Sequence, residues 1–258
     1  MTTQQEVMTS RIILRAMLPV LKILVSEDPD MKNKFKGINA KIQFFAYNDN
    51  EKTGACLVFN NGDLEIEQGL AEKPDVVFSF SSLKKMNDFF GGKLVLPSIS
   101  GWFNIFLIIK IFSLLLAMKI LMPESRPDDP LKKRLKVKMS FYMITTALSQ
   151  YNKAGDPEMV KWTKKQPDRI YQISVDDDIA AYLRVKAGKS KAGRGVYKRK
   201  RPFVHLNFNG VEGAFPVVMN DVDMVSAVRK NYLVIEGSPE YGADLGNFMK
   251  RIQNLLTG

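Results

Sequence analysis

An internal repeat constrains this chain more than any other feature of its sequence. Three short motifs occur twice, in the same order, at spacings that drift from 128 to 136 residues. They are Asp-Pro-acid-Met at 28–31 and 156–159, Ile-Gln-Phe at 42–44 with its match Tyr-Gln-Ile at 171–173, and Ile-x-Gly at 99–101 and 235–237. Landmarks that recur at a nearly constant spacing indicate repeated structural units. The 258 residues therefore predict two similar units in tandem.

Hydrophobic periodicity predicts what each unit contains. In the first half the pattern indicates a helix, a meander of strands, a helix, a short strand and a second long helix. The expected segments are a helix at 11–25, strands at 41–47, 54–59, 64–68 and 76–80, a helix from 81 or 82 to 90, a strand near 94–99, and a helix after Gly101. This arrangement is typical of the α+β class.

The second half leaves one ambiguity in this match. The strand at 76–80 corresponds either to the segment after Pro202 or to residues 212–219 (EGAFPVVM). We prefer 212–219, because this segment and 76–80 both lead into a helix, here at 221–230. That choice places the basic residues upstream in an enlarged hairpin. The predicted domains are 1–123 and 131–258, joined by a linker at 124–130 that is rich in proline and charge.

Each half also follows the element order of a known family. The residues that carry the likeness are 61–63 (NGD), 74–86 (PDVVFSFSSLKKM), Gly92, Lys93 and Gly101 in the first half, and 220–228 (NDVDMVSAV), 232–237 (YLVIEG) and 248–256 (FMKRIQNLL) in the second. The pattern resembles the sterol carrier protein type-two domain, a small lipid-binding α+β fold. The resemblance implies two tandem sterol-carrier-like domains, each a curved, mostly antiparallel sheet covered by helices. The second half departs from the family where Lys230 and Asn231 replace a Gly-Lys pair.

The cysteine and histidine counts exclude most kinds of catalytic site. One cysteine, Cys56, rules out an intramolecular disulfide and a cysteine-based metal site. One histidine, His205, rules out a multi-histidine zinc site. The sequence shows no partner for His205, so we expect it to be structural. Residues 188–190 (GKS) lack the upstream glycine of a phosphate-binding loop, since position 183 is leucine. We therefore expect a non-enzymatic protein with no metal and no cofactor.

The resemblance implies an apolar tunnel between sheet and helices that holds a sterol, a fatty acyl chain, acyl-CoA or a phospholipid. Burial of apolar surface drives such binding at about 25 cal/mol per Å². The 13 methionines fit an adaptable lining, although the same side chains also fit an ordinary core. The candidate lining residues are Phe78, Phe80, Met86, Phe89, Phe90, Phe106 and Ile109 in the first half, and Phe215, Met224, Val228, Leu245, Phe248 and Met249 in the second.

Residues 102–122 are the most informative stretch of the chain. Seventeen of these 21 residues are apolar, and Lys110 and Lys119 fall on opposite sides of a helix. Such a helix needs cover over most of its circumference. Three kinds of cover are open: the rest of the protein, a bound lipid, or a membrane, in which Lys110 near the midplane would cost about 2.5–3.5 kcal/mol.

The net charge of +11 is concentrated in one segment. Residues 184–201 hold nine basic residues and no acid, so the rest of the chain carries only +2. A solvated hairpin, an anionic membrane and a phosphate-bearing ligand all fit this segment. Nucleic acid is not expected, because Tyr197 is the only aromatic side chain nearby on which a base would stack. The candidate contact residues are Lys189, Lys191, Arg194, Lys198, Arg199, Lys200 and Arg201.

These observations predict a non-enzymatic carrier of an apolar lipid that docks reversibly on anionic membranes. The N-terminal residues show no secretory signal, so we expect a cytoplasmic protein with a peripheral membrane association left open. The competing hypothesis is a non-catalytic accessory module of a larger enzyme or membrane complex. A large uncovered apolar surface without a cavity would favour that second hypothesis.

Overall fold

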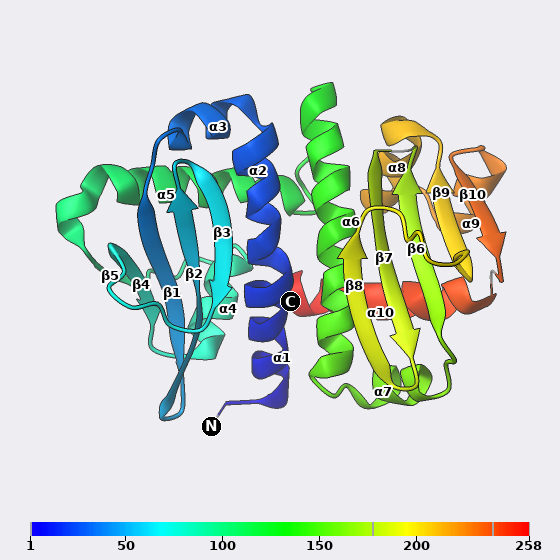
Figure 1. Cartoon of the computed structure of the whole chain (residues 1–258), viewed down its shortest axis with the longest axis horizontal. Coiled ribbons are helices and arrows are strands. Elements are labelled where there is room, and N and C mark those ends of the chain that lie inside the picture. The colour runs from blue at the N-terminus through cyan, green and yellow to red at the C-terminus, as the bar shows by residue number, and fades with distance from the viewer. Residues whose placement is uncertain (1, 177, 239, 258) are drawn as a thin grey trace. The chain divides into compact units, whose positions relative to one another are not determined.

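The chain forms two compact units in a computed structural model that describes residues 2–176, 178–238 and 240–257 (Figure 1). The first unit comprises Met1–Lys119 together with Leu255–Gly258, and the second comprises Ile120–Asn254. Each unit is built on a five-stranded sheet with helices packed against it. The predicted α+β class is therefore confirmed.

The sheet of the first unit is antiparallel except at its centre. Its strands are β1 (Ala40–Asn48), β2 (Glu51–Asn60), β3 (Asp63–Gln68), β4 (Val76–Phe80) and β5 (Ser98–Ser100). They lie in the order β3-β2-β1-β4-β5, and β1 and β4 run parallel with Ile42 opposite Val76. The predicted strand near 94–99 is thus shorter than expected and lies at the edge of the sheet.

Five α-helices accompany this sheet within the described residues. They are α1 (Gln4–Ile12), α2 (Leu21–Glu27), α3 (Pro29–Phe35), α4 (Leu83–Phe90) and α5 (Ile105–Ala117). The first helix begins earlier than predicted, because Thr3 and Glu6 form a capping box at its N-terminus. Between α1 and α2 the backbone is π-helical and then 3₁₀-helical, where Pro19 removes an amide donor from the helix.

The second unit repeats the strand order of the first. Its strands are β6 (Arg169–Val175), β7 (Ile179–Lys186), β8 (Lys189–Arg194), β9 (Val204–Phe208) and β10 (Leu233–Gly237). They lie in the order β8-β7-β6-β9-β10, and the central pair β6 and β9 is again parallel, with Tyr171 opposite Val204. Its α-helices are α6 (Pro130–Lys153), α7 (Pro157–Lys164), α8 (Gly210–Val218), α9 (Met224–Arg229) and α10 (Glu240–Thr257).

The repeated Asp-Pro motif forms the same helix cap in both units. The Asp28 carboxylate accepts hydrogen bonds from the Asp30 and Met31 amides at 3.0 and 3.2 Å, at the start of α3. The Asp156 carboxylate accepts one from the Met159 amide at 2.8 Å, at the start of α7. In each case proline follows at the first helical position, where its missing N–H costs nothing.

The repeated glutamine also has the same structural role twice. Gln43 is buried in β1, where its amide nitrogen donates to the Gly69 carbonyl and its oxygen accepts from the Ala71 amide. Gln172 is buried in β6, where its oxygen accepts from the Tyr197 amide at 3.0 Å. In each unit the loop before the parallel strand is therefore held to the sheet by hydrogen bonds to this buried glutamine.

The repeated glycine ends the last strand of each sheet. Gly101 and Gly237 have φ values of +91° and +94°, in the left-handed region that favours glycine. A Cβ atom at either position would collide with a backbone carbonyl, that of Asp75 in the first unit and that of Phe203 in the second. Local conformation and close approach both require glycine here.

The preferred match for the parallel strand of the second unit was wrong. Residues 212–219 belong largely to helix α8, and the strand beside β6 is β9, which directly follows Pro202. The alternation in β9 supplies apolar side chains that face the core, and its amides pair in register with β6. The basic residues consequently do not form an enlarged hairpin. They form the ordinary β7–β8 hairpin and the loop after it, which we name the basic loop (residues 195–201).

Candidate functional site

Helix α10 closes an apolar cavity against the sheet of the second unit, and Figure 1 shows it crossing behind β6 and β7. Successive side chains of a strand point to opposite faces, so β6 and β9 each present alternate residues to this space. The principal lining residues are Tyr171, Ile173, Val204, Leu206, Leu148, Leu245 and Met249. The cavity volume is about 20 Å³, which is close to the space that one water molecule needs.

Three sets of contacts hold α10 in place over this cavity. Near its N-terminus the Arg169 guanidinium lies between the Phe203 and Tyr241 rings, at 3.9 and 4.4 Å from their centroids. Further along, the Trp162 indole donates a hydrogen bond of 2.9 Å to Asp244.

The third contact is an ion pair between Arg251 and Glu158, with 2.6 Å between nitrogen and oxygen. Trp162 also packs edge-on against Phe248 at 5.7 Å between ring centroids. Apart from this aromatic packing, the contacts are polar or cation–π interactions at the edge of the helix.

Of the six predicted lining residues of the second half, three lie at or beside the cavity and three lie elsewhere. Leu245 and Met249 line the cavity, and Phe248 is buried beside Trp162. The other three lie elsewhere: Phe215 is in α8 under the Lys133 ammonium, and Met224 and the exposed Val228 are in α9.

The predicted lining residues of the first half are mostly close-packed core. Phe78 stacks on Phe44 at 4.7 Å between ring centroids, and Phe90 packs against the same Phe44 ring. Phe80 and Met86 are also buried, and the half-buried Phe89 contacts Phe80. The remaining two residues, Phe106 and Ile109, project from α5 and are 80% and 56% exposed.

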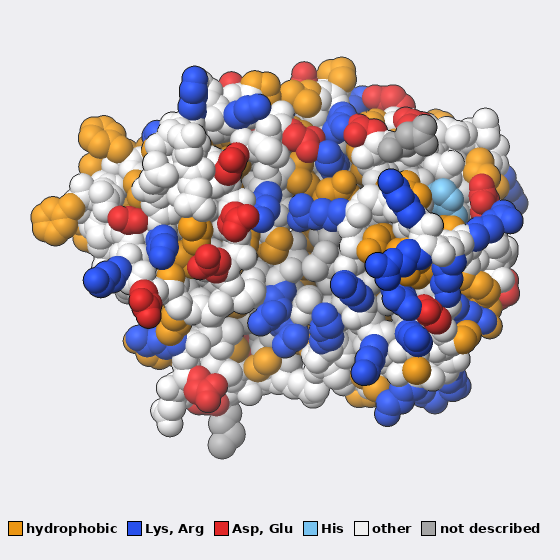
Figure 2. All heavy atoms as spheres, viewed as in Figure 1, with side chains coloured by type: hydrophobic (Ala, Val, Ile, Leu, Met, Phe, Trp, Pro, Cys, Tyr) orange, Lys and Arg blue, Asp and Glu red, His pale blue; other side chains and the backbone are white. Residues whose placement is uncertain are grey.

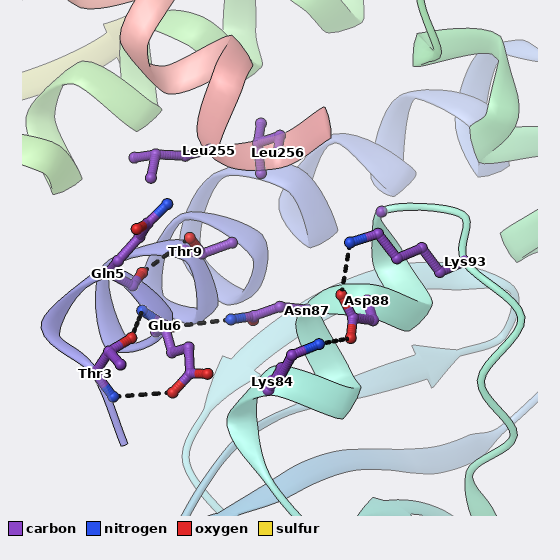
Figure 3. A pocket seen from close by; sticks show the side chains of 11 residues that line it. Thr3, Gln5, Glu6, Thr9, Lys84, Asn87, Asp88, Lys93, Leu255 and Leu256 are labelled. Carbon is purple, nitrogen blue, oxygen red and sulfur yellow. Dashed lines mark hydrogen bonds and ion pairs between the residues drawn. The ribbon is translucent and has the colours of Figure 1, made fainter. Parts of the chain in front are cut away.

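A second pocket, of about 230 Å³, lies in the first unit and is lined mainly by polar and charged residues (Figure 3). The Asp88 carboxylate accepts from the Lys84 ammonium at 2.6 Å and from Lys93 at 3.0 Å. These two hydrogen bonds hold the pKa of Asp88 below its ordinary value. Leu255 and Leu256 contribute the apolar part of the lining. Glu6 is the fourth charged residue of the lining, so the two acids and two lysines of the pocket balance in charge.

The predicted basic contact residues do not share one face. Lys189 and Lys191 are exposed on β8, whereas Arg194 lies on the opposite side of the strand, over the Tyr142 ring of α6 at 4.9 Å. Figure 2 shows lysine and arginine side chains gathered over the sheet of the second unit.

Four of the predicted basic residues are exposed in the basic loop: Lys198, Arg199, Lys200 and Arg201. Lys200 contacts Asp168, and Arg201 contacts Glu236 at 3.5 Å. The basic patch is therefore partly neutralised.

The structure gives His205 a partner that sequence analysis missed. Its Nε2 lies 2.7 Å from the Ser174 hydroxyl, which also donates to Asn207 at 2.9 Å. Burial lowers the pKa of His205, while Glu236 on the neighbouring strand opposes that shift. Ser174 is only 2% exposed, so its oxygen cannot be reached by a substrate in this structure. Gln172 is the register partner of His205 and Ser174 that of Asn207, and this pairing of β6 with β9 was not predicted from the sequence.

No family model and no curated protein matches this sequence. Solved structures do show likenesses. One is sterol carrier protein 2 like 2 from Aedes aegypti, with 16% identity over 43% of this chain and 97% of that chain and a TM-score of 0.29. Another is the stereoselective inverting sec-alkylsulfatase Pisa1 from Pseudomonas sp., with 12% identity over 56% of this chain and 28% of that chain and a TM-score of 0.26. The chain thus spans less than a third of the alkylsulfatase.

Among the described residues, no group of three or more histidine, cysteine, aspartate or glutamate side chains is arranged to hold a metal ion. One helical run, Trp102–Leu121, is long and apolar enough to cross a membrane by length and composition, and only 28% of its most apolar window is buried.

Proposed function

We propose that the chain is a non-enzymatic lipid-binding protein, built from two sterol-carrier-like units, whose second unit holds an apolar chain between α10 and its sheet. The observation that carries this proposal is the apolar cavity beneath α10, with polar contacts confined to the edge of the helix. Mostly apolar walls with a few polar groups at the rim are typical of sites for apolar ligands.

The cavity must enlarge to admit a lipid, because ligand pockets usually measure about 300–1,000 Å³. Displacement of the N-terminal part of α10 breaks the Arg169 cation–π contacts and the Trp162–Asp244 hydrogen bond. These contacts are worth roughly 2–4 kcal/mol together. An acyl chain that buries ten methylene groups gains about 8 kcal/mol. The ligand can therefore supply the free energy that moves α10.

The first unit is expected to remain unloaded. Its stacked Phe44 and Phe78 rings and the edge-on contact of Phe78 with Phe112 of α5 occupy the corresponding space between sheet and helix. We therefore propose a stoichiometry of one lipid per chain.

Native mass spectrometry, followed by identification of the extracted lipid, tests the proposal. We expect one lipid adduct on the wild-type chain. Leu206→Phe enlarges a side chain inside the cavity and should lower the occupancy, whereas Val234→Phe, on an exposed site of the neighbouring strand, should leave it unchanged. A mass that stays free of lipid after incubation with sterols, fatty acids and phospholipids would refute the carrier function.

A specific observation favours a second candidate, the non-catalytic accessory module. The outward face of α5 is apolar and uncovered, and a protein partner could pack there. A lipid-free second unit combined with a protein bound at α5 would support this candidate instead.

A further inference from the structure

Helix α5 presents an unpartnered apolar face in the first unit. Four of its residues, Ile108, Ile111, Leu114 and Leu115, are buried, and the opposite side is exposed. Phe103 is fully exposed, and Leu94 and Leu96 in the preceding loop are 98% and 84% exposed. The other exposed members of this α5 face are Trp102, Ile105, Phe106, Ile109 and Leu116.

Figure 2 shows hydrophobic side chains standing out from the surface where Figure 1 places β5 and the start of α5. These side chains protrude individually from the surface and do not form a flat surface together. Protruding aromatic and leucine side chains are suited to a soft partner into which they can sink.

Lysines border the α5 face on both sides. Lys110 lies in α5 and the exposed Lys119 lies in the 3₁₀ turn that follows it (Met118–Leu121). Nine residues at about 100° each place the two lysines on opposite sides of the axis, with the exposed stripe between them. Long lysine side chains reach from such flanks to phosphate groups while their stems remain along apolar surface.

No aspartate or glutamate occurs between Asp88 and Glu124. The charges within this segment are therefore all positive. From another element, Asp30 of α3 lines a pocket with Lys110 and is accompanied there by Lys34.

The packing of α5 excludes a transmembrane orientation for the folded unit. Ile108, Ile111 and Leu114 are buried against the unit, and Phe112 contacts Phe78 of β4 at 5.6 Å between ring centroids. A helix that crossed the bilayer would have to leave these contacts. The arrangement is instead that of a helix lying in the interface, with one apolar face and basic residues at its borders.

We propose that the α5 face docks the first unit on an anionic lipid bilayer, with α5 parallel to the membrane plane. Phe103 and Phe106 enter the acyl region, Trp102 sits at the level of the headgroups, and Lys110 and Lys119 contact lipid phosphates. The absence of acids in the segment favours an anionic bilayer over a protein surface with hydrogen-bonding groups of both kinds. This docking does not depend on a ligand beneath α10, so either proposal can fail alone.

Flotation with phosphatidylcholine vesicles, with and without phosphatidylserine, tests the docking. The wild-type chain should bind both and prefer the anionic vesicles. The double variant Phe103→Gln/Phe106→Gln should lose binding to both, by about tenfold or more for each phenylalanine. The double variant Lys110→Gln/Lys119→Gln should lose about fivefold per lysine on anionic vesicles only. A matched control, Leu70→Gln/Val225→Gln, removes two exposed apolar residues outside the α5 face and should bind like the wild type.

Tryptophan fluorescence locates the contact, because Trp102 is on the α5 face and Trp162 is in the second unit. Vesicles with brominated acyl chains should quench wild-type emission and leave the Trp102→Phe variant unquenched. Equal quenching of both proteins would overturn the proposal. A stable dimer of the lipid-free wild-type chain that is absent in the Phe103→Gln/Phe106→Gln variant would also overturn the proposal, because a second copy of the chain would then cover the α5 face.

Discussion

Lys136 of α6 offers a sharp test of how the segment after α5 is held. This side chain is only 2% exposed, and its ammonium donates to the carbonyl oxygens of Ile120, Met122 and Ser125 at 2.9, 2.8 and 2.8 Å. One charged group thus satisfies three acceptors where the chain turns from the 3₁₀ end of α5 toward α6. The Met122 oxygen also accepts from the Ser125 amide at 3.1 Å, so Lys136 is its second donor.

Replacement by Lys136→Met keeps the length of the side chain and removes the donors. The Met122 carbonyl keeps the Ser125 amide as a donor, whereas the Ile120 and Ser125 carbonyls lose theirs at a cost of about 1 kcal/mol each. Relief of the buried charge returns about 1 kcal/mol. The net loss of unfolding free energy is therefore about 1 kcal/mol, which at a typical urea m-value of about 2 kcal/mol per M shifts the midpoint down by about 0.5 M.

Urea titration followed by Trp162 emission measures this change, because Trp162 reports on the second unit. A Trp102→Phe background removes the other tryptophan. Lys153→Met, an exposed lysine at the end of the same helix, is the control and should shift the midpoint little. Equal midpoints for Lys136→Met and Lys153→Met would refute the argument that the three carbonyls depend on Lys136.

The pH dependence of the same measurement separates two opposing effects at Lys136. Burial lowers its pKa to about 8, while the three carbonyl oxygens favour the ammonium form. With a folded pKa below the unfolded value of 10.5, the unfolded chain binds more protons between those values. Wild-type stability relative to Lys136→Met should therefore rise from pH 8 to pH 10.5. A decrease in this relative stability between pH 8 and pH 10.5 would mean that the hydrogen bonds to the three carbonyls raise the folded-state pKa of Lys136 more than burial lowers it.

Two further changes probe the second unit. Gly237→Ala forces a Cβ against the Phe203 carbonyl at a positive φ, so it should lower the unfolding free energy by about 2 kcal/mol or more. The control Gly246→Ala lies at an open helical position and should raise the unfolding free energy by up to about 1 kcal/mol. Thermal melts of the two variants and the wild type measure both changes. The Arg184 hydrogen bonds hold the pKa of Asp168 at about 2, so its stabilising effect is present above pH 4 and is lost as the pH falls toward 2. Asp168→Asn should remove that part of the acid dependence, and an unchanged acid titration would contradict the assignment.

Local chemistry makes the repeat recognisable in the amino-acid sequence alone. The Asp-Pro cap, the buried glutamine and the strand-ending glycine each depend on a few neighbouring residues, so each leaves a fixed sequence signature. The α+β class follows from the same local patterns. The assignment of 212–219 as a strand was wrong because its phenylalanine and valines favour a strand locally, whereas the place beside β6 is taken by β9, a pairing that local preference does not predict.

Local sequence patterns predict the two repeated units, the strands of the first unit, and an apolar helix with a lysine on each side. The packing of distant segments is what brings Ser174 beside His205, fills a core with Phe78 and Phe90, and leaves Phe215, Met224 and Val228 away from the cavity that Leu245 and Met249 line. The physical reason is that composition sets how apolar a segment is, whereas exposure depends on what packs against it. The α5 stretch shows this most clearly, since its sequence fits a buried core as well as the uncovered face that the fold leaves open.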